Sequence, residues 1–164
     1  MAERSRRYGW IPIEAVGPPL AGRTGLAYFQ GLRDGTIPAQ PIAATIGWRV
    51  VEAELGRVRF AVTPAEHLFH GGGMVHGGVL ATLLDGACAG AVMSTLPENA
   101  LCASLALNVQ YLNAVREPHD LFATGDITHR ASRIATAEVR LEDASGKLYA
   151  RATATLMITL GRDG

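Results

Sequence analysis

A stretch of 23 residues, Gly71 to Met93, constrains the fold more than any other part of the sequence. It begins as a glycine-rich turn and continues as an apolar run too long for a typical strand, which predicts a helix from about His76 to about Leu96. Because this helix is apolar on nearly every side, we expect it to be buried rather than half-exposed. Asp85 lies in its middle, and a buried carboxylate is unfavourable unless it is paired or used.

The glycines also leave backbone N–H groups uncovered at the start of this helix, where the helix dipole is positive. A turn that can bind an oxyanion, followed by an acid on the same helix, is the main functional clue in the sequence.

Composition narrows the class of protein. A chain of 164 residues is long enough for one sizeable core, and a net charge of +0 gives no sign of a nucleic-acid partner or an anionic membrane surface. The central helix is too rich in Gly and Ala, and too interrupted by Asp85, to span a membrane. The two cysteines, Cys88 and Cys102, lie in apolar surroundings, and the N-terminus lacks the apolar core of a signal peptide, so we expect free thiols and a cytoplasmic protein.

The rest of the chain divides into a tail and one domain. Residues 1–22 carry several arginines and prolines and predict an irregular N-terminal tail, and residues 23–164 predict the domain. Thr24 can cap a short helix through Arg33, and Thr36 to Pro41 is expected to be a linker. The loop before the central helix is expected at Glu66–Val75. Six strands are expected from alternating polarity, at about Thr45–Leu55, Arg57–Thr63, Leu101–Leu112, Asp120–His129, Ile134–Glu142 and Lys147–Leu160.

This order, two strands, a long helix and four strands, predicts an α+β fold. An antiparallel sheet wrapped around the buried helix is the simplest way to cover it, and this is the hotdog architecture.

The run His76-Gly77-Gly78-Val79-Leu80-Ala81-Thr82-Leu83-Leu84-Asp85 resembles the signature of the PaaI-like acyl-CoA thioesterases of the hotdog superfamily. Two flanking segments agree with this family: Asp34 to Ala43, which resembles its approach to the first strand, and Asp143 to Ala150, which resembles its last hairpin. The resemblance covers about Leu26 to Ile158. It implies hydrolysis of an acyl-CoA thioester without a cofactor, at an active site shared between the subunits of a homodimer, often within a dimer of dimers.

The resemblance also implies roles for individual residues. The backbone N–H of Gly77 would hold the thioester carbonyl, Asp85 would activate water or attack directly, and Ser104 would help to place the water. The family usually has an asparagine where this chain has His70, and it often has an acid at the position of Ala106. A neutral imidazole can donate one hydrogen bond, as the amide would, so His70 is expected to assist the substrate.

His76 and Gly78, on either side of Gly77, are further candidates for substrate binding. Several candidate residues also have a plain structural interpretation. Gly77 and Gly78 can serve tight helix–sheet packing, His76 can bond backbone in the turn, and Ser104 can fill space. Arg130, Ser132 and Arg133 could meet the phosphates of coenzyme A or form an ordinary solvated turn.

Other kinds of site fit the sequence less well. The spacing of His67, His70 and His76 matches no common zinc pattern, so we expect no metal. His76 replaces the last glycine that a dinucleotide fingerprint requires. Ser94 and Cys88 have no histidine beside them in sequence to activate them as nucleophiles.

The sequence therefore predicts an acyl-CoA thioesterase, and two alternatives remain. One is a hotdog acyl-thioester dehydratase or hydratase, and the other is a non-catalytic module that binds acyl-CoA.

Overall fold

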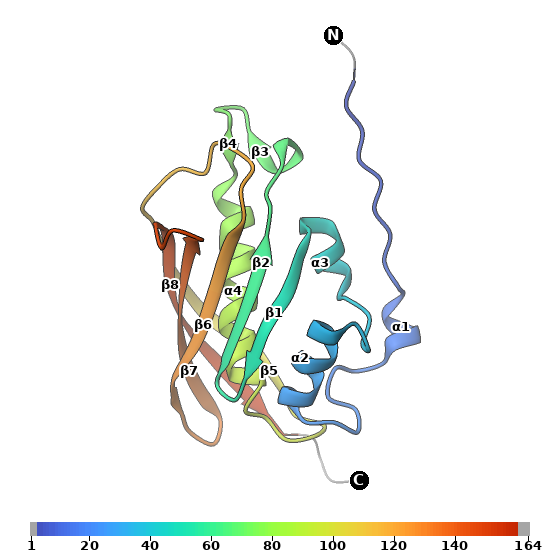
Figure 1. The fold of residues 1–164 in the computed structure, drawn as a ribbon. Coiled ribbons are helices and arrows are strands. Elements are labelled where there is room, and N and C mark those ends of the chain that lie inside the picture. Colours follow the sequence, from blue (N-terminus) through green and yellow to red (C-terminus); the bar gives the residue numbers. More distant parts are fainter. Residues whose placement is uncertain (1–2, 161–164) are drawn as a thin grey trace.

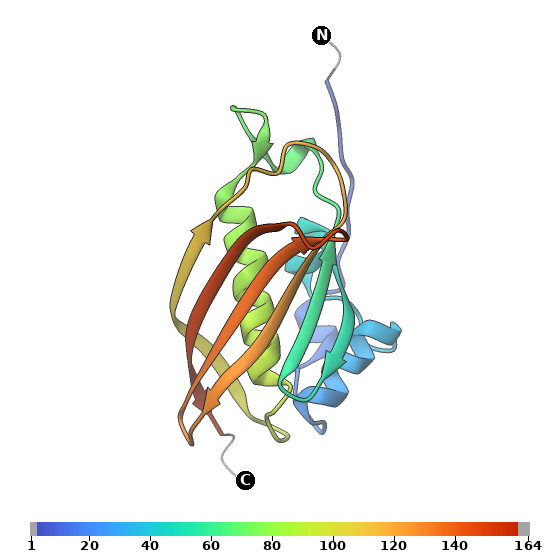
Figure 2. The same cartoon turned by 60° about the vertical axis from the view of Figure 1, so that its left-hand side comes forward.

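The computed structural model describes residues 3–160. A six-stranded antiparallel sheet, in the order β1-β2-β6-β7-β8-β5, curves around the central helix α4, Gly77–Met93 (Figures 1 and 2). This arrangement is the hotdog fold, and it confirms the predicted fold class. The strands are β1 (Trp48–Glu54), β2 (Arg57–Val62), β5 (Leu101–Tyr111), β6 (Leu121–Arg130), β7 (Ile134–Asp143) and β8 (Leu148–Thr159).

The central helix packs closely on the sheet because its residues and those of β6 are small at the contact. A Cβ atom at Gly125 of β6 would lie 2.2 Å from the carbonyl oxygen of Ala87, so only glycine allows this approach. Leu83, Leu84 and Cys88 are almost fully buried against the sheet. The helix begins after His76, as expected within one residue, but it ends at Met93 and not at Leu96.

The prediction that this helix would be buried on every side is wrong for the single chain. One stripe of the helix remains exposed or half-buried, because the six-stranded sheet covers only one side of the helix. The stripe follows the helical repeat and consists of Gly78, Thr82, Asp85, Ala89 and Met93.

The N-terminal part adds a helix beside the central helix, on the same side of the sheet. The predicted helix at Thr24 is α2, Gly25–Asp34, and Thr24 caps it by accepting a hydrogen bond from the N–H of Ala27. This helix lies over β1 (Figure 1), where Phe29 meets Phe60 of the sheet. A single turn, α1 (Ile13–Val16), precedes it. The division at residues 22 and 23 remains a prediction, and its outermost residues, 1–2 and 161–164, lie outside the described part.

Two local predictions need correction. The first strand begins at Trp48 and not at Thr45, because Pro41–Ile46 forms a further helix, α3. Proline occupies the first turn of α3, where its missing N–H is harmless. The loop before the central helix contains a 3₁₀ turn, η1 (Glu66–Leu68), and a small antiparallel pair, β3 (Phe69–His70) and β4 (Met74–Val75).

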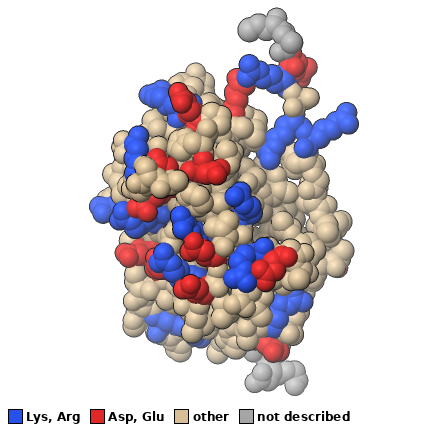
Figure 3. Space-filling view, viewed as in Figure 1, with Lys and Arg blue, Asp and Glu red and all other residues tan. Residues whose placement is uncertain are grey.

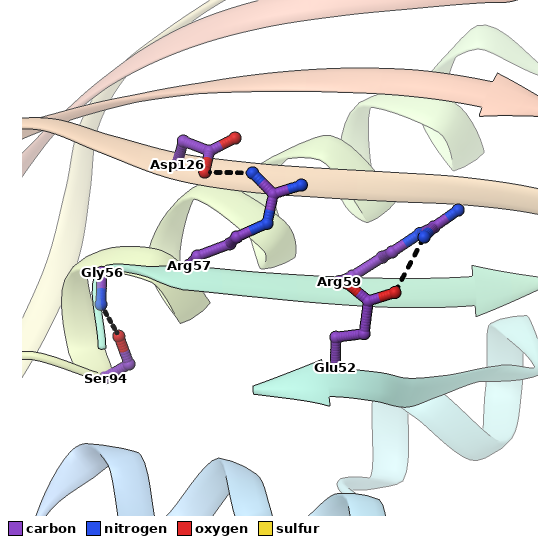
Figure 4. A network of polar contacts seen from close by, with 6 residues as sticks. All are labelled: Glu52, Gly56, Arg57, Arg59, Ser94 and Asp126. Atoms are coloured by element: carbon purple, nitrogen blue, oxygen red, sulfur yellow. Dashed lines mark hydrogen bonds and ion pairs between the residues drawn. The ribbon is translucent and has the colours of Figure 1, made fainter. Parts of the chain in front are cut away.

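Two cross-strand ion pairs connect β2 to β1 and β6, and the buried hydroxyl of Ser94, just after the central helix, accepts a hydrogen bond from the N–H of Gly56 between β1 and β2 (Figure 4). Arg57 bonds its partner Asp126 on β6 at 2.6 Å, and Arg59 bonds its partner Glu52 on β1 at 2.8 Å. Residues of both signs are intermingled on the face shown in Figure 3, without a field of one sign.

No helix among residues 3–160 is long and apolar enough to cross a membrane.

Candidate functional site

The start of the central helix presents one backbone N–H that has no acceptor within residues 3–160. The Nδ1 atom of His76 accepts from the N–H of Gly78 at 2.9 Å and so caps the helix. The next two N–H groups, of Val79 and Leu80, both bond the carbonyl oxygen of His76. The N–H of Gly77 is therefore the one first-turn donor left for a ligand, at the positive end of the helix dipole.

His70 stands beside this helix start. Its loop folds back through β3 and β4, so the rings of His70 and His76 lie 6.2 Å apart between centroids. The Nδ1 atom of His70 accepts from the N–H of Gly72 at 2.9 Å. In the neutral ring the proton then sits on Nε2, which can donate to a ligand.

The structure brings two other predicted residues together. The hydroxyl of Ser104 on β5 donates to Oδ1 of Asp85 at 2.6 Å. No other group in the described chain bonds this carboxylate, so Oδ2 is left for a water molecule or a substrate. The pair lies on the open stripe of the helix, and Asp85 is half-buried.

A β-bulge at Leu105 decides which side chains of β5 face the helix. Ser104 is paired with Leu156 on β8, and the next paired residue is Ala106, so Leu105 is the extra residue. Alternation would place even-numbered residues on one face throughout, but the bulge shifts the pattern by one. Ser104 and, beyond the bulge, Tyr111 therefore both face the central helix.

Tyr111 is the site residue that the sequence analysis missed. Its hydroxyl donates to the carbonyl oxygen of Gly77 at 3.0 Å, and its ring lies 3.3 Å from where a Cβ of Gly77 would be. With His70, Gly77 and Leu80 it lines a cavity of about 250 Å³ at the helix start. The one sign in the sequence was the glycine at position 77, because a residue without a side chain allows a neighbour to approach closely.

Within one chain the two halves of the predicted site stay apart. Gly77 and Asp85 are eight residues apart on one helix, which separates them by about 12 Å along its axis. The N–H of Gly77 also points towards the helix start, away from Asp85.

The predicted phosphate-binding residues lie at the opposite end of the helix from Gly77. Arg130 donates to the carbonyl oxygen of Thr95, just beyond the end of the helix, at 2.8 Å. Ser132 and Arg133 follow in the turn between β6 and β7, where the carbonyl oxygen of Arg133 accepts from the N–H of Ile158.

The sequence did not favour Cys88 or Ser94 as a nucleophile, and in the structure both residues are buried. Burial raises the pKa of the Cys88 thiol to about 12 and that of Cys102 to about 11, with Asp85 adding to both shifts. The Ser94 hydroxyl accepts from the N–H of Gly56 and donates to the carbonyl oxygen of Ala91. Across residues 3–160 no three His, Cys, Asp or Glu side chains gather as metal ligands would.

Comparison with known proteins shows which families these features resemble. The family model described as "Thioesterase superfamily" matches residues 72–150, which include the helix start, Asp85 and Ser104. A protein of Halobacterium salinarum named as an esterase is 37% identical over 99 residues, which are 57% of this chain. The match spans 64% of that relative's length.

Solved structures share the fold over most of the chain. A protein of Ralstonia eutropha JMP134, named as a thioesterase related to phenylacetic acid degradation, is 28% identical with a TM-score of 0.72, covering 79% of this chain and 98% of its own. The PaaI protein of E. coli, 20% identical, shares the fold with a TM-score of 0.70 over 74% of this chain and 86% of its own. A Streptococcus mutans UA159 protein solved with bound acetyl CoA, 22% identical, shares it with a TM-score of 0.65 over 71% of this chain and 91% of its own.

The matching family model, the shared architecture and the helix signature agree with one another. The chain has the hotdog fold, and over residues 72–150 it is similar to the thioesterase superfamily.

Proposed function

We propose that the protein hydrolyses an acyl-CoA thioester to a free acid and coenzyme A. The observation that carries this proposal is the pair Asp85–Ser104, in which one carboxylate oxygen is held and the other is left open on an uncovered helix face. The fold itself accommodates such a ligand, since the Streptococcus mutans protein of this fold was solved with acetyl CoA.

The chemistry follows from the groups at the site. The N–H of Gly77, which has no acceptor within residues 3–160, donates to the thioester carbonyl oxygen, and this oxygen gains negative charge as the carbonyl carbon is attacked. Asp85 takes a proton from water through Oδ2, the hydroxide oxygen bonds the carbonyl carbon, and the carbon–sulfur bond then breaks. The thiolate of coenzyme A leaves with its electron pair and takes up a proton. Direct attack by Asp85, through an anhydride that water then hydrolyses, uses the same residues.

Supporting roles are assigned to the neighbours of these two groups. Ser104 holds the carboxylate so that its free oxygen faces the water, and His70 donates through Nε2 to the substrate. Gly78 and His76 shape the turn, because their mutual hydrogen bond leaves the N–H of Gly77 as the remaining donor.

A second copy of the chain is the proposed partner. The stripe around Asp85 and the unpaired edge of β5 are both open in one chain, and Leu101 and Leu105 on that strand are 50% and 57% exposed. A two-fold axis that sets two central helices antiparallel would bring Gly77 of one chain near Asp85 of the other. It would also carry the turn with Arg130, Ser132 and Arg133 towards the helix start of the other chain, where the phosphates of coenzyme A could meet them. A dimer and a dimer of dimers are both compatible with this two-fold arrangement.

We also propose a cytoplasmic location, because the thiols of Cys88 and Cys102 are free.

A panel of acyl-CoA substrates with detection of free thiol tests the proposal. Asp85→Asn keeps the shape and the contact with Ser104 but removes the base, so thiol release should fall by at least about a hundredfold. The control is Asp126→Asn, which removes a carboxylate that only pairs with Arg57. Near-normal turnover by Asp85→Asn would exclude the assigned mechanism.

The same panel separates the alternatives. A dehydratase or hydratase would change the enoyl absorbance without releasing thiol, and a binding module would do neither.

A further inference from the structure

The contact between Tyr111 and Gly77 is the strongest feature of the site that the proposed mechanism leaves unused. We propose that Tyr111 is a positioning residue that holds the first turn of the central helix so that the N–H of Gly77 meets the developing oxyanion. This inference rests on the proposed hydrolysis, with Gly77 as the oxyanion donor.

The first turn needs an external support. It begins with two successive glycines, Gly77 and Gly78, and glycine restricts its own backbone less than any other residue, so a helix that starts this way tends to fray. The capping bond from Gly78 to His76 fixes the N-terminal side of the turn. The carbonyl of Gly77 lies on the opposite side of the same planar peptide and points the other way along the helix.

Tyr111 adds a second support, from the other side of this peptide, in two ways. Its hydroxyl donates to the carbonyl oxygen of Gly77 at 3.0 Å, which fixes the plane of the peptide that follows Gly77. Its ring occupies the space where a side chain of residue 77 would stand, with Cζ 3.3 Å from the ideal Cβ position. Gly77 is thus held between His76 and Tyr111, and both Gly77 and Tyr111 line the cavity of about 250 Å³.

The sheet gives this contact a defined place. Ser104 and Tyr111 lie on the same strand, and the bulge at Leu105 turns both towards the central helix. One strand therefore supports both halves of the chemistry, the carboxylate through Ser104 and the oxyanion donor through Tyr111. In a shared site these two supports would act on different active sites of the dimer.

Tyr111→Phe tests the proposal because it keeps the ring and removes only the hydroxyl. Losing one hydrogen bond that matters in the transition state should lower kcat roughly threefold to tenfold and leave KM within about twofold. Tyr111→Ala removes the ring as well and should lower kcat further. The control is Gln110→Ala, which removes the neighbouring bond to Arg151 on the other face of the strand and should leave both constants unchanged.

Amide hydrogen exchange gives a readout that is independent of catalysis. Residues 70–82 should exchange faster in Tyr111→Phe than in the parent, while Gln110→Ala should match the parent. Parental kcat in Tyr111→Phe, an effect on KM alone, an equal loss in Gln110→Ala, or unchanged exchange over residues 70–82 would each overturn the assignment. A parent without Asp85-dependent thiol release would instead refute the proposed function, and the exchange experiment would still decide whether Tyr111 orders the turn.

Discussion

A shared active site makes a quantitative prediction for mixed dimers. Gly77 and Asp85 are about 12 Å apart along one helix, and the N–H of Gly77 points away from Asp85. A carbonyl oxygen bound to that N–H lies roughly 3 Å further out, so the total separation along the axis is about 15 Å. This separation is too large for a water held by Asp85 of the same chain to reach the carbonyl carbon.

Two inactive variants should therefore restore activity when they are co-expressed. Asp85→Ala removes the base, and Gly77→Pro removes the N–H at a first-turn position that proline tolerates. Random pairing makes about half of the dimers mixed, and each mixed dimer has one intact site of two, so roughly a quarter of parental thiol release should return. Dimers carrying two different affinity tags, purified in sequence, provide the mixed species directly.

Two controls remove the remaining ambiguities. Gly77→Ala adds the same Cβ atom beside Tyr111 but keeps the N–H, so it should retain far more activity than Gly77→Pro. In the second control, one chain carries both Asp85→Ala and Gly77→Pro and is co-expressed with the parent. This mixture should keep about a quarter of parental activity if sites are shared, and about half if each chain holds its own site. No recovery in demonstrated mixed dimers, together with half activity in this second mixture, would refute the shared site.

The remaining predictions concern one site residue and two structural contacts. His70→Asn should preserve or raise kcat/KM because the amide can replace the imidazole donor, and His70→Ala should lower it; identical kinetics in both and the parent would reduce His70 to a loop residue. Ser94→Ala should lower the free energy of unfolding in urea by about 1–3 kcal/mol, because the buried N–H of Gly56 loses its acceptor. Thr95→Ala, the control, removes only a local bond to the carbonyl oxygen of Val92 and should have the smaller effect. Hydrogen bonds from Ser145, then from the N–H groups of Ser145 and Lys147 and from Tyr149, lower the pKa of Asp143 from 3.8 to about 2. Because the folded pKa is the lower one, Asp143 stabilises the fold above pH 3.8 and loses this effect as the pH falls to about 2. The difference in Tm between the parent and Asp143→Asn should accordingly shrink across that interval, and a constant difference would contradict it.

Local patterns in the sequence were sufficient for most of the elements. Alternating polarity located β6, β7 and β8 within a residue or two, and Thr24 marked the start of α2. Pro41, at the first position of α3, is also a local signal for the start of a helix, but together with Pro38 it suggested a linker instead. The signature from His76 to Asp85 indicated the family, because glycines at a helix start and an acid farther along it serve one kind of chemistry.

Tertiary structure decided how these elements meet. Apolar residues all round the central helix predicted complete burial, yet one sheet covers one side, and a stripe including Asp85 stays open for a second chain. The bulge at Leu105 turned Ser104 and Tyr111 towards the helix, although simple alternation would have put them on opposite faces. The contact of Tyr111 with Gly77 joins residues that are 34 positions apart. Such contacts depend on register, bulges and the angle between strand and helix, which arise only when the whole sheet closes around its core.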